Sequence, residues 1–295
     1  MVLGFTIFEV SLIVVIALFI CATVCALSME AAVLFTPAFL FLFPKLIPTF
    51  PHVGPNEAIG LAITIEFFGY TSSVTGYWFR RQIDFAIVGK ALALTIPLAV
   101  LARAVSYFVP AQGLLLVFGV LLMGLSVALY RAHRYPKETL PNYRPRVYLL
   151  KLGNPKSFSE FHPTGPDQLI LMSAGALAGL VGIAIGEISN TFMTVRKKIP
   201  IKISTGTSAL ILHVTILSAL AMNLAILKLA PGPFHAEQIA IPWRIAAIIA
   251  PVVLVGGQIG AFINSRLKDQ MILKILMTVY LLVGLFVFFR TFQGG

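Results

Sequence analysis

Glu187, Ser189 and Asn190 lie close together within an otherwise apolar stretch that runs from Val181 to Met222. Residues 186–190, with the sequence GEISN, predict a break in an apolar helix. A carboxylate, a hydroxyl and an amide are costly to bury in an apolar segment unless they face a cavity or a polar partner. Ser189 and Asn190 could donate hydrogen bonds to an oxyanion, or each could cap the helix that follows the break.

A related pattern occurs earlier, where Ser28, Met29 and Glu30 interrupt another apolar run. If the two breaks approach the membrane midplane from opposite sides, Glu30 and Glu187 occupy equivalent turns and line one central site. Broken helices direct backbone N–H groups into such a site, which suits an anion, and the glutamates would carry protons. The alternative is that each glutamate caps a short helix or lies at the membrane surface.

Two further ionisable residues and one hydroxyl lie within apolar runs. Glu66 is near the middle of its run, and His213 lies at the corresponding depth in the second half of the chain. Both are candidate proton or substrate groups. Alternatively, Glu66 is a structural glutamate bonded to Lys90 or His213, and His213 is an interhelical hydrogen-bonding group. Thr207 belongs to a hydroxyl-rich stretch that could line a polar path or pack helices closely.

The composition excludes a soluble domain. The chain has 295 residues, of which 58% are hydrophobic and 11% charged, and its mean hydropathy is +0.94. The net charge of +11 arises from basic residues between the apolar runs, so we expect no nucleic-acid binding. Cys21 and Cys25 have no His or Cys cluster beside them, which indicates buried side chains and no metal site. No catalytic or cofactor-binding motif is present, so we expect neither an enzyme nor a bound cofactor.

Apolar runs long enough for membrane helices alternate with basic connections. About 20 apolar residues cross a bilayer. The runs fall at about 5–27, 31–50, 56–79, 84–108, 111–130, 168–194, 203–229, 239–265 and 271–290. The second of these contains three prolines and should be bent or broken. The long polar segment 131–167 has seven Lys or Arg residues against three acidic ones, and divides membrane repeats at 1–130 and 168–295.

Charge placement predicts an inverted repeat. Cytoplasmic connections are rich in Lys and Arg, which places the linker 131–167 in the cytoplasm. If all the basic clusters are cytoplasmic, 168–194 must enter and leave on that side as a hairpin, and 5–50 must be a hairpin open to the outside. Each half is then a broken or re-entrant hairpin followed by three transmembrane helices, with inverted topology and with both termini outside. The predicted fold is an all-α, polytopic membrane protein.

The second half resembles the TauE/SafE sulfite exporter family, also called the toluene-sulfonate uptake permeases. The resemblance rests on LVGIAIGEISNTFMTV and on the helix start Ser204-Thr205-Gly206-Thr207-Ser208. The first half is similar in SMEAAVLFTPAFLFLFP and in the basic entry into the helix after Asp84, and IAPVVLVGGQIGAFINSRL resembles a small-residue helix near the end of the family pattern.

This resemblance implies an inner-membrane carrier of small sulfur-containing anions, such as sulfite or an organosulfonate. Family members usually carry glycines at both breaks, where this chain has Glu30 and Glu187. The glutamates favour proton coupling of an anion carrier, or else a cationic or zwitterionic substrate that they would ligate directly. The expected partners are the small substrate and the lipid bilayer.

Overall fold

The computed structural model describes residues 4–106, 108–134, 145, 162–182, 184–229 and 241–293. Every regular element in these residues is helical. In chain order the elements are α1 (Ile7–Leu27), α2 (Ala32–Pro37), the π-helix η1 (Ala38–Leu42), α3 (Phe43–Leu46), α4 (Pro55–Phe79), α5 (Phe85–Ser106), α6 (Ala111–Arg134), α7 (Gly165–Val181), α8 (Ile185–Thr191), the π-helix η3 (Phe192–Arg196), α9 (Ile201–Leu229), α10 (Trp243–Arg266) and α11 (Asp269–Gln293).

The all-α prediction is confirmed for the described part of the chain, and most helices match the predicted apolar runs within a few residues. The predicted linker 131–167 lies largely outside the described residues. At its edges, helix α6 continues to Arg134 and α7 already begins at Gly165.

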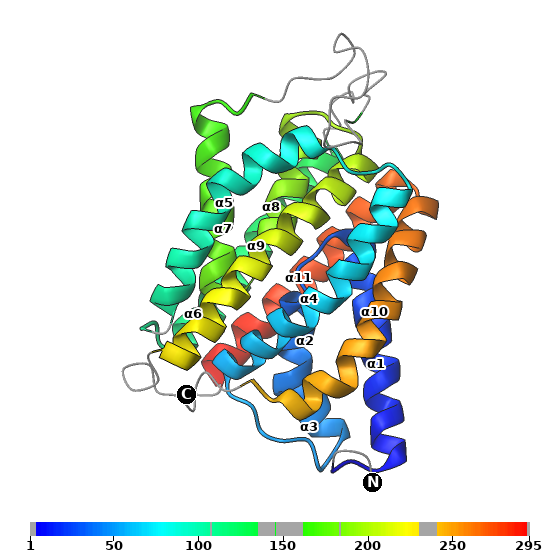
Figure 1. Cartoon of the computed structure of the whole chain (residues 1–295), viewed down its shortest axis with the longest axis vertical. Helices are drawn as coiled ribbons and strands as arrows, with labels where there is room; N and C mark the ends of the chain where they lie inside the picture. Colours follow the sequence, from blue (N-terminus) through cyan, green and yellow to red (C-terminus); the bar gives the residue numbers. More distant parts are fainter. Residues whose placement is uncertain are drawn as a thin grey trace.

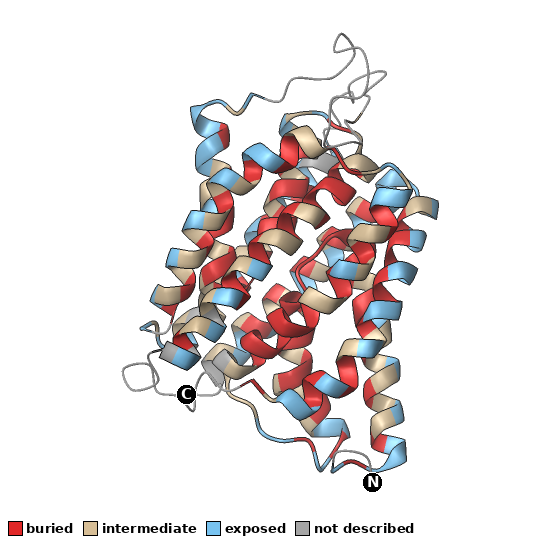
Figure 2. Ribbon diagram, viewed as in Figure 1, coloured by how far each residue is buried: buried red, intermediate tan, exposed pale blue. Residues whose placement is uncertain are grey.

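Five helices in the described residues are long and apolar enough to cross a membrane: α1, α5, residues 201–226 of α9, α10 and most of α11. Large apolar side chains on the outside of the bundle are exposed, among them Phe19 at 73% and Phe79 at 77%. Figure 2 shows buried residues on the inward faces of the helices and exposed residues on the outward faces. An apolar surface of this extent is stable in contact with lipid, so the chain is a multi-pass membrane protein.

The first hairpin consists of α1 and the broken segment α2–η1–α3. Helix α1 ends at Leu27 and is followed by Ser28, which has a left-handed backbone with φ of 52°. The following segment turns back toward the end where α1 begins (Figure 1), and there Thr49 Oγ1 donates to Glu9 Oε1 at 2.6 Å. Pro37 lacks an N–H and its ring displaces the preceding turn, which accounts for the π-helix that starts directly after it. The predicted bend in 31–50 is therefore confirmed.

The second hairpin consists of α7 and the segment α8–η3, and its break differs from the prediction. Residues 186–190 were expected to be the break, but they are helical. The chain turns instead at Gly182 and Ala184, which have φ of 71° and 97°. A left-handed glycine ends α7 at no steric cost, and the Glu187 carboxylate in the first turn of α8 accepts from the Ala184 N–H at 3.2 Å. Glu187 therefore stabilises the start of a helix.

Small residues allow the hairpins to pack closely on long helices. Helix α7 packs on α5, and α1 packs on α10. A Cβ atom added at Gly179 of α7 would lie 2.1 Å from the Ala99 carbonyl oxygen, and one added at Gly260 of α10 would lie 2.7 Å from the Ala22 carbonyl oxygen. Gly175 and Gly179, like Gly256 and Gly260, form the GxxxG spacing that lets membrane helices approach.

Different segments of the chain lie at the two ends of the molecule. The start of α1 and the end of α11 lie at one end, whereas the end of α6 and the start of α7 lie at the other (Figure 1). Helices α4 and α9 pack against each other between the hairpins, and α6 packs against α11. This arrangement holds the two breaks inside the bundle.

Candidate functional site

The tips of the two hairpins meet inside the bundle and exchange hydrogen bonds. The Glu30 backbone N–H donates to Glu187 Oε1 at 3.0 Å, and the Gly186 N–H donates to Glu30 Oε1 at 2.9 Å. A Cβ atom at Gly186 would lie 2.5 Å from the Ser28 carbonyl oxygen, so the two chains touch there. The structure thus brings together the two glutamates that sequence analysis singled out, each serving the other hairpin.

The positions of these glutamates relative to their helices are not equivalent, contrary to the expectation. Glu30 precedes the N-cap residue of α2, whereas Glu187 is the third residue of α8. Both are almost wholly buried, with exposed fractions of 0% and 2%. The two glutamates are therefore related by their crossed hydrogen bonds and not by matching positions in their helices.

Tyr280 is a neighbour of Glu187 that sequence analysis missed. It comes from α11, it is 1% exposed, and its hydroxyl interacts with the Glu187 carboxyl. A buried tyrosine hydroxyl normally needs a polar partner. The available signal was therefore a tyrosine in the middle of an apolar helix, but only the packing of α11 identifies its partner.

The first tip is also held by groups on α4 and α9. Tyr70 donates from its hydroxyl to the Met29 carbonyl oxygen at 2.6 Å, and the hydroxyls of Ser28 and Ser208 are 2.7 Å apart. These bonds satisfy a carbonyl and a hydroxyl that the helix break leaves without intrahelical partners. Ser28 is therefore part of the contact between the first hairpin and α9.

Two buried glutamates retain oxygens without hydrogen bonds. Among the described residues, nothing donates to Glu30 Oε2 or to either carboxyl oxygen of Glu66. Glu66 is 2% exposed and lies within electrostatic reach of the Ala31 N–H, directly after Glu30. The structure therefore gathers three carboxyl groups at the meeting point of the hairpins.

The remaining hydroxyl and amide candidates are engaged in structural hydrogen bonds. Ser189 Oγ donates to the Ile185 carbonyl oxygen of its own helix. Asn190 Nδ2 donates to Thr205 Oγ1 at 3.4 Å, which links α8 to α9. These two side chains lie within α8, so neither caps the start of that helix as the alternative reading expected.

Thr207 performs a comparable role for another helix. Its Oγ1 accepts from the Asp84 N–H at 2.9 Å, just before α5 begins at Phe85. Thr207 is wholly buried in this contact. It therefore fixes the start of α5 against α9.

His213 contacts two residues of α4 other than Glu66. Its ring stacks on Phe67 with centroids 5.5 Å apart, and its Nε2 is 3.4 Å from Thr71 Oγ1. The suggested bond between Glu66 and His213 or Lys90 is not formed, since neither Glu66 oxygen accepts a hydrogen bond within the described residues.

The fold and the site together define a polytopic helical membrane protein in which two hairpins meet at buried, carboxylate-linked tips. The family model described as sulfite exporter TauE/SafE matches residues 13–287, and the chain belongs to this family of membrane transporters. It is 24% identical over 264 residues to the probable membrane transporter protein YunE of Bacillus subtilis (strain 168), an alignment that covers 88% of this chain and 89% of that protein. No solved structure matches the chain.

Proposed function

We propose that the protein is a secondary active carrier of a small sulfur-containing or organic anion, such as sulfite or an organosulfonate, coupled to protons through its buried glutamates. Membership of the sulfite exporter family supports the transport class and the anion. The observation that carries the coupling is the group of three buried carboxyls, Glu30, Glu66 and Glu187, at the hairpin tips. Ionisable residues at such depth are characteristic of proton and substrate pathways.

We further propose that the carrier is an inverted repeat in the inner membrane, with the segment 131–167 in the cytoplasm and both termini outside. The order of elements supports this, because each half has a hairpin with a short α-helix continued by a π-helix, followed by three long helices. The packing also supports it, since α1 rests on α10 of the other half as α7 rests on α5. In such repeats the substrate site lies where the broken helices meet.

The coupling follows from what a carboxyl group does to an anion. A protonated carboxyl donates a hydrogen bond to the anion, whereas a deprotonated one repels it. Glu66 suits this role best because no described residue forms a well-aligned hydrogen bond to its oxygens, and the nearby Ala31 N–H compensates the carboxylate charge only in part. Glu30 has one such oxygen, and Glu187 is held by the N–H groups of Glu30 and Ala184.

The test is uptake of labelled sulfite and of a small organosulfonate into proteoliposomes, with and without an imposed pH gradient. Coupling of one proton to one anion gives accumulation of about tenfold per pH unit, since one unit corresponds to about 1.36 kcal/mol. Glu66→Gln should abolish gradient-driven accumulation while downhill exchange continues. Glu57→Gln, in the first turn of α4 where Glu57 accepts from the Gly54 N–H, is the control and should behave as the unchanged protein.

Two outcomes would contradict the proposal. If neither sulfite nor the organosulfonate is transported, the proposed anionic substrate is excluded. Transport that responds to the pH gradient equally in Glu66→Gln, Glu187→Gln and the unchanged protein would retain the carrier but exclude these glutamates as proton sites.

A cationic or zwitterionic substrate is the second candidate, and one feature favours it. The polar groups gathered at the tips are carboxyls, and the unpaired oxygens of Glu30 and Glu66 are acceptors that a cation could occupy. Competition by amines or divalent cations for binding to the reconstituted protein, with none by sulfite or sulfonates, would support this candidate. Competition by the anions alone would exclude it.

A further inference from the structure

A concave apolar groove lies on the lipid-facing side of the first hairpin, away from the glutamates. It has a volume of about 750 Å³ and lies between α1, the segment α2–η1–α3 and α11. Its lining is apolar except at one end, and includes Phe19, Leu34, Pro37, Phe41 and Phe286. This volume falls within the range of about 300–1,000 Å³ that is typical of small-molecule sites.

Two basic side chains form the only charged part of this lining. They are Lys45 at the end of the hairpin and Arg290 near the end of α11, and both are exposed. The Arg290 guanidinium lies over the Phe41 ring, 5.5 Å from its centroid, and 5.9 Å from the Phe286 centroid. These aromatic contacts hold the charge at the mouth of the groove.

The length of the groove matches one leaflet of a bilayer. Leu34 lies just after the buried hairpin tip, and Lys45 follows eleven residues later, which is about 16 Å along a helix. The hydrocarbon core of a bilayer is about 30 Å thick, so one leaflet is about 15 Å. The end of α3 and the end of α11 lie at the same end of the molecule (Figure 1). An acyl chain along the groove would therefore place its headgroup beside the two cations.

We propose that this groove binds an anionic phospholipid, with an acyl chain along α1, η1 and α11 and with the phosphate group between Lys45 and Arg290. The apolar lining recognises the chain, and the paired cations select an anionic headgroup over a zwitterionic one. Basic residues at a membrane surface are attracted to anionic lipids in this way.

The bound lipid contacts the hairpin whose tip carries Glu30. Leu34, Pro37 and Phe41 belong to the segment that follows Glu30, and Phe286 belongs to the helix whose Tyr280 contacts Glu187. A lipid in the groove therefore contacts both the first hairpin and α11 on their lipid-facing side. The proposal does not depend on the transported substrate, and its test requires no transport measurement.

The test is native mass spectrometry of the full chain in mild detergent, titrated with phosphatidylglycerol or with phosphatidylcholine of the same acyl chains. We expect one tightly held phosphatidylglycerol and weaker retention of phosphatidylcholine. The double variant Lys45→Gln, Arg290→Gln should weaken phosphatidylglycerol binding by about thirty-fold, since each basic residue near a membrane surface contributes about fivefold. The control Lys268→Gln, Lys274→Gln removes two exposed lysines that do not line the groove, and should change binding less than about twofold.

A second variant separates the acyl chain from the headgroup. Val15 lines the groove and is 64% exposed, so Val15→Trp fills the groove without disturbing the core and should also displace the lipid. Retention of phosphatidylglycerol in Val15→Trp, or equally tight binding of soluble glycerol phosphate, would overturn the proposal in favour of a simple phosphate site. A dimer that dissociates when Lys45 and Arg290 are replaced would overturn it in favour of a second copy of the chain.

Discussion

The buried glutamates Glu187 and Glu66 differ in the hydrogen bonds that their carboxyl groups accept. Glu187 accepts from the backbone N–H groups of Glu30 and Ala184, and so satisfies donors that two helix breaks leave open. Glu66 has no such bonds within the described residues. The first arrangement joins two hairpins, whereas the second is the basis for the proposed role of Glu66 as a proton carrier.

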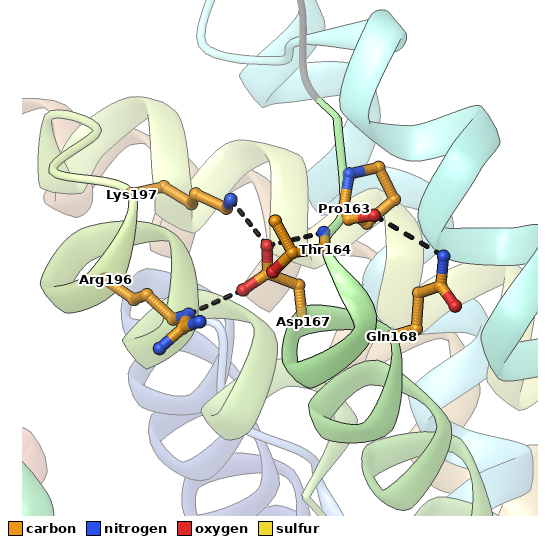
Figure 3. A network of polar contacts seen from close by, with 6 residues as sticks. All are labelled: Pro163, Thr164, Asp167, Gln168, Arg196 and Lys197. Carbon is orange, nitrogen blue, oxygen red and sulfur yellow. Dashed lines mark hydrogen bonds and ion pairs between the residues drawn. The ribbon is translucent and has the colours of Figure 1, made fainter.

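Asp167 has a different role, because its carboxylate joins the start of α7 to the end of η3, at the open end of the second hairpin. Its carboxylate binds Arg196 Nε at 2.5 Å and Lys197 Nζ at 2.6 Å, and it accepts from the Thr164 N–H at 2.9 Å (Figure 3). Burial of the Asp167 carboxyl works to raise its pKa. The Lys197 ammonium, the Thr164 N–H and the Arg196 guanidinium outweigh burial and hold that pKa well below its ordinary value.

We expect Asp167→Asn to lower the melting temperature at pH 7 by a few degrees, through a loss of about 1–2 kcal/mol of stability, because Arg196 is half exposed and water screens that pair. A lowered pKa in the folded state stabilises the protein above the ordinary carboxyl pKa of about 3.9, and this contribution is lost as the pH falls below it. The difference between Asp167→Asn and the unchanged protein should therefore narrow below about pH 4 in thermal unfolding. Asp269→Asn, an exposed first-turn residue of α11, is the control. A difference that stays constant from pH 7 to pH 3 would contradict this account.

At the scale of elements, the hairpins are positioned by close helix crossings. Gly179 permits α7 to lie against the Ala99 carbonyl group of α5, where no side-chain atom fits. Gly89, on α5, has no atom within 4 Å of an added Cβ and is exposed. The two glycines share helical conformation but differ in their surroundings.

Gly179→Ala should therefore destabilise the protein by about 1–3 kcal/mol, because the added methyl group forces the helices apart. Gly89→Ala should be neutral or slightly stabilising, since alanine favours a helix over glycine by about 1 kcal/mol. Denaturation of the two variants in the same detergent provides the comparison. If Gly179→Ala and Gly89→Ala unfold at the same denaturant concentration, the close contact between α5 and α7 does not contribute to stability as proposed.

At the scale of the whole molecule, the two ends should face opposite sides of the membrane. His52 lies in the exposed connection before α4, at the end where α1 begins, and Lys268 lies in the connection between α10 and α11. The tip residue Met29 is wholly buried. The proposed topology places His52 outside, Lys268 in the cytoplasm and Met29 away from either solution.

Labelling of single cysteines with an impermeant maleimide tests this topology, in a background where the buried Cys21 and Cys25 are replaced by Ala. His52→Cys should react in intact cells, Lys268→Cys only after permeabilisation, and Met29→Cys in neither case. Reaction of His52→Cys and Lys268→Cys from the same side would exclude the proposed inverted topology.

The sequence alone determined the class of protein, the helix positions and the two interruptions, because apolar length and charge placement are local properties that lipid imposes on each segment. It also identified Glu30, Glu187 and Glu66 as unusual, since a carboxyl group within an apolar run is costly to bury. It placed the second break at 186–190 instead of 182–184, because a left-handed Ala184 is not visible in a residue pattern.

Only the tertiary structure decided which of these residues meet. The crossed bonds between Glu30 and the second hairpin join positions more than 150 residues apart. The interactions of Tyr280 with Glu187 and of His213 with Phe67 likewise depend on how α11, α9 and α4 pack. Partners of this kind depend on the packing of distant helices against one another, and that packing is a property of the whole chain.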